Sequence, residues 1–267
     1  MDLGLKDRRA LVLASSRGLG RGIAEALAAE GARVMLTGRD EAALKDTAAQ
    51  INARGAGQAD WVTVDLAGPD FAAKLADHAR AQMGGVDILV NNTGGPKPGA
   101  AHDIDVAVLM AQAQAMVASV IDLTGRLIPD MCAQGWGRVL TVASSGIEQP
   151  IPNLALSNTL RGALAGWNTT LASEVAGDGV NCNMLLPGRV QTNRVDQLDS
   201  AAAEKQGKPL DDVRVRRAIA HAISQAQIVQ FKGASVTEPA VSIIPKGYLG
   251  TDDKAPLPAY DLAKAKA

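Results

Sequence analysis

The chain has 267 residues, of which 47% are hydrophobic, and a formal net charge of −1. This length and composition are enough for one well-buried α/β domain, while the even mixing of acids and bases excludes the basic surface of a nucleic-acid-binding protein. No apolar run approaches the roughly 18 residues of a membrane span, and residues 1–4 lack the start of a signal peptide. We therefore expect a cytoplasmic protein that has no membrane segment and acts on a small molecule.

Six short apolar runs alternate with longer helical patterns along the chain. The runs occupy residues 10–14, 33–37, 61–64, 88–91, 139–143 and 181–186. Continuous apolarity is typical of parallel strands that are buried on both faces. The sequence thus predicts an α/β fold, a single-domain, doubly wound parallel sheet of the Rossmann type over residues 1–250. An atypical C-terminal segment ends in a polar tail at 251–267.

A glycine-rich turn follows the first predicted strand and precedes an alanine-rich helix. Its residues are Ser15, Ser16, Arg17, Gly18, Leu19 and Gly20. Such a turn lets backbone N–H groups approach a pyrophosphate and directs the positive end of a helix at it. A glycine cluster alone is weak evidence, since glycines also end strands for steric reasons. A second strand at βαβ spacing strengthens the prediction of a dinucleotide site.

The end of the second strand indicates which dinucleotide binds. Enzymes that bind NAD place an acid there to accept the ribose hydroxyls, whereas a 2′-phosphate is repelled by an acid and attracted by arginine. This chain has Gly38 followed by Arg39, and Arg17 stands in the neighbouring turn. We predict NADP(H) in preference to NAD(H), with two ordinary exposed arginines as the alternative.

The order of these motifs resembles the short-chain dehydrogenase/reductase family over roughly residues 5–195. The likeness continues through Asp65, the Asn91-Asn92-Thr93-Gly94 turn, Ser144 and the Pro187-to-Thr192 segment. The resemblance implies that Asp65 and Leu66 meet the adenine, and that Asn91, Thr93 and Gly94 line the cofactor cleft. It also implies that Pro187, Gly188, Val190 and Thr192 hold the nicotinamide end, and that the chain forms a homo-oligomer, a dimer or tetramer. Taken singly, each residue is also compatible with a strand end or a tight turn.

The catalytic positions depart from the family pattern. The family uses a Ser, a Tyr, a Lys four residues after the Tyr, and an upstream Asn; the aligned residues here are Ser144, Ser157, Arg161 and Met116. The chain looks like a divergent, 3-oxoacyl-carrier-protein-reductase-like branch with Ser-Asn-x-x-Arg in place of Tyr-x-x-x-Lys. An aliphatic hydroxyl is a far poorer proton donor than a phenol, and arginine stays protonated. Arg161 can still hold ribose hydroxyls or a substrate carboxylate.

A substitute proton donor is therefore needed, and Glu148 is the nearest candidate. Burial of Glu148 beside Ile147 and Pro150 would favour its protonated form. The alternative is a solvated loop carboxylate. A water relayed through Ser157 and Asn158 is a second route for the proton.

Three functions remain open at this point. The leading hypothesis is an NADP(H)-dependent oxidoreductase that interconverts a carbonyl and a secondary alcohol. The second is a lyase, isomerase or hydrolase in which Glu148 abstracts a proton and Arg161 binds a carboxylate. The third is a catalytically idle protein that binds the cofactor. No set of His, Cys and acidic residues has metal-ligand spacing, so we expect no metal.

Overall fold

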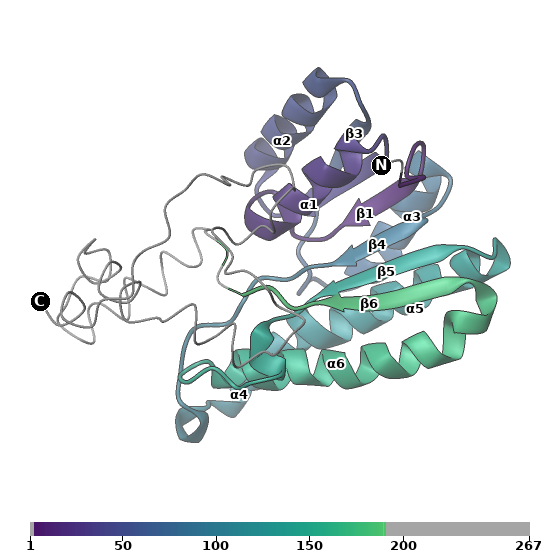
Figure 1. Cartoon of the computed structure of the whole chain (residues 1–267). Coiled ribbons are helices and arrows are strands. Elements are labelled where there is room, and N and C mark those ends of the chain that lie inside the picture. The colour runs from purple at the N-terminus through teal and green to yellow at the C-terminus, as the bar shows by residue number, and fades with distance from the viewer. Residues whose placement is uncertain (1–2, 189, 191–267) are drawn as a thin grey trace, which may run out of the picture. The chain divides into compact units, whose positions relative to one another are not determined.

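The computed structural model of the chain describes residues 3–188 and residue 190, and its centre is one parallel six-stranded sheet (Figure 1). The strands are β1 (Arg9–Val12), β2 (Arg33–Gly38), β3 (Gln58–Thr63), β4 (Ile88–Asn91), β5 (Gly137–Val142) and β6 (Val180–Leu185). Their order is β3-β2-β1-β4-β5-β6, so the winding reverses between β1 and β4. This is the doubly wound Rossmann-type topology that the sequence predicted, in which ligands bind beyond the carboxyl ends of the strands.

Helices cover both faces of the sheet (Figure 1). The long ones are α1 (Gly18–Ala29), α2 (Glu41–Arg54), α3 (Phe71–Met83), α5 (Ser119–Ala133) and α6 (Ala155–Val175). Ala10 and Val12 of β1 pack with α1 and α2, whereas Leu11 between them packs with α3 and α5. Alternate residues of one strand thus enter two different core layers, which explains the continuous apolar runs in the sequence.

Most strand boundaries differ from the predicted runs by one to three residues. β3 begins at Gln58, three residues before the expected apolar run, because it is an edge strand whose residues alternate between exposed and partly buried. β1 ends at Val12, and Ala14 has a left-handed φ of 45° where the chain turns toward α1. The apolar character of Leu13 and Ala14 therefore reflects burial beneath a turn.

The stretch Val106–Ala133 is the one described helix that is long and apolar enough to cross a membrane by length and composition. It joins α4 (Val106–Ala113), a π-helical turn (Gln114–Ala118) and α5. Our expectation that no run approaches this length was wrong. Leu123, Leu127 and Met131 of α5 lie in the core beside α3, whereas only 22% of the apolar window is buried, and one such helix is weak evidence for a span.

A polar cluster at the amino edge of the sheet joins β1, the segment before β4 and the end of α5. Oδ2 of Asp87 accepts hydrogen bonds from the backbone N of Arg9 (2.8 Å) and from its Nε (2.9 Å). The Arg9 guanidinium also donates to the Gly84 carbonyl (2.7 Å) and to Oε1 of Gln134 (3.0 Å). Burial opposes ionisation of Asp87, but the hydrogen bonds and positive charge of Arg9 outweigh burial and hold the pKa of the Asp87 carboxyl below its ordinary value.

Replacing Asp87 by Asn should lower the free energy of unfolding by about 1–3 kcal/mol, because the partly exposed Arg9 guanidinium loses its buried, charged partner. A lowered native pKa stabilises the fold above the ordinary value of about 3.9, and this contribution is lost as the pH falls through the native value. Urea unfolding should therefore show a constant wild-type advantage near neutral pH that shrinks only below about pH 4. Asp122→Asn, which removes an exposed partner of Arg126, is the control and should change stability by less than about 1 kcal/mol.

Candidate functional site

The carboxyl ends of the strands are fastened to one another by backbone hydrogen bonds beyond the sheet ladder. The N–H of Ser15 donates to the Thr37 carbonyl (2.7 Å) after β1 and β2, and the N–H of Ala143 donates to the Leu185 carbonyl (2.8 Å) after β5 and β6. The parallel register brings these ends to a single edge. The predicted dinucleotide-binding residues of the described chain gather at this edge.

Gly20 allows α1 to begin close against the ends of β1 and β4. A Cβ at Gly20 would lie 2.4 Å from the Ala14 carbonyl oxygen and 2.6 Å from Nδ2 of Asn92. Gly18, the first residue of α1, has a φ of 58°, and Leu19 packs against the core under α1. The first N–H groups of α1 therefore lie at the strand-end edge, as anion binding at a helix start requires.

The two serines of the turn have structural contacts. The hydroxyl of Ser15 is fully buried, donates to the Val12 carbonyl (2.9 Å) and accepts from the N–H of Thr37 (2.9 Å). The side chain therefore points inward and shapes the turn, and whether Ser15 contacts the cofactor stays a prediction. Ser16 lies against the end of β2, where a Cβ on Gly38 would be 3.3 Å from the Cβ and Oγ of Ser16.

The turn between β2 and α2 carries the charges of the site. Arg39 is exposed, and the guanidinium of Arg17 forms an ion pair with Oδ2 of Asp40 at 3.6 Å. Oδ1 of Asp40 accepts from the N–H of Ala43 (3.1 Å) and so caps α2. The turn therefore carries Arg39 and, through its ion pair with Asp40, lies beside Arg17; the sequence analysis did not assign Asp40 to the site.

Asp65 and Leu66 follow β3 at this edge. Asp65 is exposed, and its Oδ1 accepts from the N–H of Ala67 (3.0 Å), which holds the carboxylate in a local turn. Leu66 is half-buried against the core. These positions are compatible with the adenine-side role that the resemblance implies.

The segment after β4 contains two buried polar atoms that lack a hydrogen-bond partner among the described residues: Oδ1 of Asn91 and Oγ1 of Thr93. Nδ2 of Asn91 donates to Oγ1 of Thr124 (3.0 Å), while Gly94 is exposed and a Cβ there would meet nothing within 4 Å. Buried polar groups normally have partners. A nucleotide bound at this edge would offer hydrogen bonds beside an open glycine, so the residues present fit the expected cofactor.

Ser144 and Asn158 come together at Gly146. Ser144 lies two residues beyond β5, and its Oγ accepts from the N–H of Gly146 (3.1 Å) at the start of a short 3-10 turn. Asn158, in the first turns of α6, donates through Nδ2 to the Ile151 carbonyl (2.9 Å). A Cβ on Gly146 would lie 2.5 Å from Oδ1 of Asn158 and 3.4 Å from Oγ of Ser144.

Arg161 places a positive charge behind the end of β5. Its side chain is buried, and Nη1 donates to the Val142 carbonyl at 2.7 Å. Met116, which aligns with the family's catalytic Asn, is buried in the π-helical turn, and Ser157 is half-buried in α6. A fixed guanidinium and a hydroxyl thus lie on the helix that usually carries the phenol and the amine.

Glu148 does not have the surroundings that we expected. Its side chain is exposed, and so are those of its neighbours Gln149 and Pro150. Among the described neighbours along the chain, Gln149 and Pro150 do not form the apolar enclosure proposed from the sequence. Whether Glu148 donates a proton stays a prediction.

Part of the predicted nicotinamide loop is described. The Pro187 carbonyl accepts from the N–H of Ser145 (3.4 Å), Gly188 is exposed, and Val190 is 44% exposed. Thr192 and the predicted domain boundary at residue 250 lie outside the described residues. Within the described part, no group of three His, Cys, Asp or Glu side chains is placed to hold a metal ion.

Three contacts of the site escaped the sequence analysis. Nδ2 of Asn92 donates to the carbonyls of Leu13 and Ala14 (both 3.2 Å), and Thr124 holds Asn91 from α5. Gly99 ties the loop after β4 to the loop before α6, because its N–H donates to the Asn153 carbonyl at 2.8 Å. The adjacent asparagines were the only local signal; Thr124 and Gly99 act through segments far away in the sequence.

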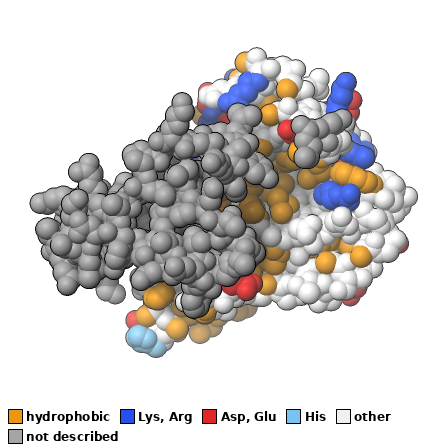
Figure 2. Space-filling model, viewed as in Figure 1, with side chains coloured by type: hydrophobic (Ala, Val, Ile, Leu, Met, Phe, Trp, Pro, Cys, Tyr) orange, Lys and Arg blue, Asp and Glu red, His pale blue; other side chains and the backbone are white. Residues whose placement is uncertain are grey.

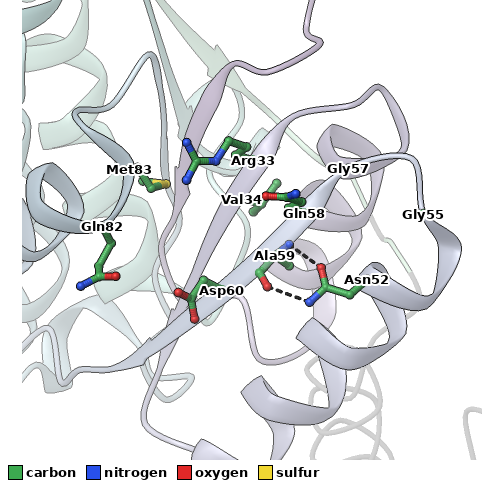
Figure 3. Close-up of a pocket in the computed structure, with 10 residues that line it drawn as sticks. All are labelled: Arg33, Val34, Asn52, Gly55, Gly57, Gln58, Ala59, Asp60, Gln82 and Met83. Atoms are coloured by element: carbon green, nitrogen blue, oxygen red, sulfur yellow. Dashed lines mark hydrogen bonds between the residues drawn. The ribbon is translucent and has the colours of Figure 1, made fainter.

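A hollow of about 550 Å³ lies at the opposite edge of the sheet, between the starts of β2 and β3 and the ends of α2 and α3 (Figure 3). There the Asn52 amide is hydrogen-bonded to the backbone of Ala59, and the walls are polar and open. The hollow therefore lies away from the candidate site residues at the strand ends. On the face seen in Figure 2, basic and acidic side chains are scattered and form no continuous charged surface.

Two family models match the chain. The model of short chain dehydrogenases matches residues 8–203. The model of the middle region of family 5 bacterial extracellular solute-binding proteins matches residues 179–267, about a third of the chain. The first match contains every described site residue, and the second covers mainly residues outside the described part.

Curated relatives and solved structures agree with the first match. The D-beta-hydroxybutyrate dehydrogenase of Cupriavidus necator is 33% identical over 79% of this chain and 81% of its own length. The L-sorbose reductase of Gluconobacter frateurii, solved with NADPH and L-sorbose, has a TM-score of 0.76 at 28% identity, covering 83% of this chain and 84% of its own. A 3-oxoacyl (acyl-carrier-protein) reductase from Agrobacterium tumefaciens with NADP bound has a TM-score of 0.70 at 32% identity, covering 76% and 77%.

Gly146→Ala should disturb the close contact between Asn158 and Gly146. The new methyl group would meet an amide that is held by the Ile151 carbonyl, so we expect a loss of about 1–3 kcal/mol in unfolding free energy. Gly162→Ala on α6 is the matched control, because a Cβ there meets nothing within 4 Å and alanine favours the helix. Equal stability of the two variants in urea unfolding would contradict the contact.

Proposed function

The chain belongs to the short-chain dehydrogenase/reductase family, and from that premise we propose that it is an NADP(H)-dependent oxidoreductase that interconverts a carbonyl and a secondary alcohol with a non-standard proton donor. The observation that carries the proposal is the pair of arginines, Arg17 and Arg39, at the corner beside Gly38. The reductase structures with bound NADPH and NADP support the cofactor class. A cytoplasmic homo-oligomer, dimer or tetramer, remains part of the proposal.

Contact distances favour the phosphorylated cofactor. An acid in the place of Gly38 would bring its Cβ to 3.3 Å from Ser16, tighter than ordinary van der Waals contact. The sequence has no carboxylate at this position to accept the ribose hydroxyls, and packing against Ser16 disfavours one there. Guanidinium groups on both sides of that position supply charge-assisted hydrogen bonds to a phosphate.

The residues after β5 and in α6 would have separate roles in the reduction. The nicotinamide supplies the hydride that forms the new C–H bond. Ser144 would hold the reacting oxygen, and the positive charge of Arg161 would favour the negative charge that develops on it. Glu148, or a water relayed by Ser157 and Asn158, would deliver the proton. Exposure of Glu148 gives it direct proton exchange with solvent.

One observation keeps a second candidate in view. Met116 is 2% exposed, so an apolar side chain fills the place where the family has a polar asparagine. This feature favours a protein that binds the nucleotide without turning over a carbonyl. Nucleotide binding with no turnover over a broad carbonyl panel would support it, whereas product formed without any change in nicotinamide absorbance would favour a lyase, isomerase or hydrolase.

The cofactor proposal predicts unequal effects on the two nucleotides. Arg17→Ala and Arg39→Ala should each raise the Kd for NADPH by about tenfold, because each removes a charge-assisted contact to the 2′-phosphate. The Kd for NADH should change little. Calorimetric titration of the full chain tests this, and tighter binding of NADH than NADPH by the wild type would reject the preference.

The role of Ser144 predicts a loss of turnover without a loss of cofactor. Ser144→Ala should lower kcat by about 10²-fold or more, because the reacting oxygen loses its oriented hydrogen bond. Ser145→Ala is the control, since Ser145 is exposed and adjacent. The measurement is the rate of NADPH oxidation with a carbonyl substrate, and full turnover by Ser144→Ala would remove the serine from the mechanism.

A further inference from the structure

We propose that Asp40 is a specificity-determining residue that weakens the binding of the phosphorylated cofactor and so limits the preference for NADP(H). The inference rests on the proposed function, because it needs the 2′-phosphate to bind between Arg17 and Arg39. It concerns an acid that sits two residues beyond the end of β2 and pairs with one of those arginines.

Asp40 is the fixed member of its ion pair. Its Oδ1 accepts from the N–H of Ala43 at 3.1 Å as the N-cap of the 14-residue helix α2. The Arg17 side chain that reaches Oδ2 is 69% exposed, against 46% for Asp40. Any rearrangement at this corner therefore moves the arginine and leaves the carboxylate in place.

The arginine is easily drawn away from Asp40. An exposed ion pair with a 3.6 Å separation contributes little to stability, so a phosphate dianion would replace the carboxylate as the partner of Arg17. The capping bond would keep Asp40 beside the phosphate. Repulsion between the two negative groups would remain, and at this exposure it corresponds to about a three- to tenfold loss of NADPH affinity.

Asp40 does not have the geometry of the acid that binds ribose hydroxyls in NAD-dependent enzymes. That acid stands at the end of the second strand, a position taken here by Gly38, where Ser16 would crowd a larger side chain. Asp40 is instead turned to the first N–H groups of α2. Its charge should therefore matter for NADPH and not for NADH.

The test is Asp40→Asn in the full chain, because asparagine caps a helix as well as aspartate and removes only the charge. We expect the Kd for NADPH to fall about three- to tenfold and the Kd for NADH to stay unchanged. Asp46→Asn is the matched control: it removes the same charge from the same helix, but Asp46 pairs with Arg21 at 3.8 Å. The Asp46 variant should bind both nucleotides like the wild type.

The outcomes separate the inference from the function on which it rests. If Arg17→Ala weakens NADPH binding while Asp40→Asn leaves it unchanged, the cofactor proposal stands and the role of Asp40 is rejected. Loss of NADH affinity in Asp40→Asn would also reject it, since Asp40 would then accept ribose hydroxyls. If the wild type binds neither nucleotide, both the cofactor proposal and this inference are wrong.

Discussion

The turn after β1 is held by the buried side chains of Ser15 and Asn92, and the arrangement of the strand-end edge depends on them. The Ser15 hydroxyl connects the Val12 carbonyl to the Thr37 N–H, and the Asn92 amide binds the carbonyls of Leu13 and Ala14. These bonds join the ends of β2, β1 and β4, the strands between which the winding of the sheet reverses. Because their partners are backbone groups that leave the sheet ladder, the bonds satisfy buried donors and acceptors while they set the direction in which the chain enters α1.

The corner beside Gly38 combines close packing with opposing charges. Ser16 lies close to the end of β2, so a side chain at Gly38 would be crowded, and the residue present there has no group to accept ribose hydroxyls. The next two residues differ in their surroundings: Arg39 is exposed, and Asp40 caps α2. The requirement for a helix cap thus places a carboxylate next to a pair of arginines. In our proposal, Asp40 both caps α2 and weakens the binding of the 2′-phosphate.

The residues after β5 and at the start of α6 are held by specific contacts. Gly146 leaves room for the Asn158 amide to approach beside Ser144, and Arg161 is held by the Val142 carbonyl. A π-helical turn carries the buried Met116. Such turns often mark functional positions. With serine and arginine in place of the phenol and the amine, orientation and fixed positive charge are the contributions to catalysis that these residues can make.

The sequence by itself determined the class of fold, the order of the strands along the chain and the glycine-rich turn, because apolar runs and turn chemistry are local properties. It also proposed Ser144, Arg161, Arg17 and Arg39 as site residues, and their roles stay predictions. Only the tertiary structure decided that Ser15 faces inward, that Glu148 is exposed and that Arg17 meets Asp40. Each of these depends on neighbours from another segment, as with Asn92 beneath Ala14 or Asn158 against Gly146. Burial and hydrogen-bond partners depend on how the chain packs, so residue type and spacing do not predict them.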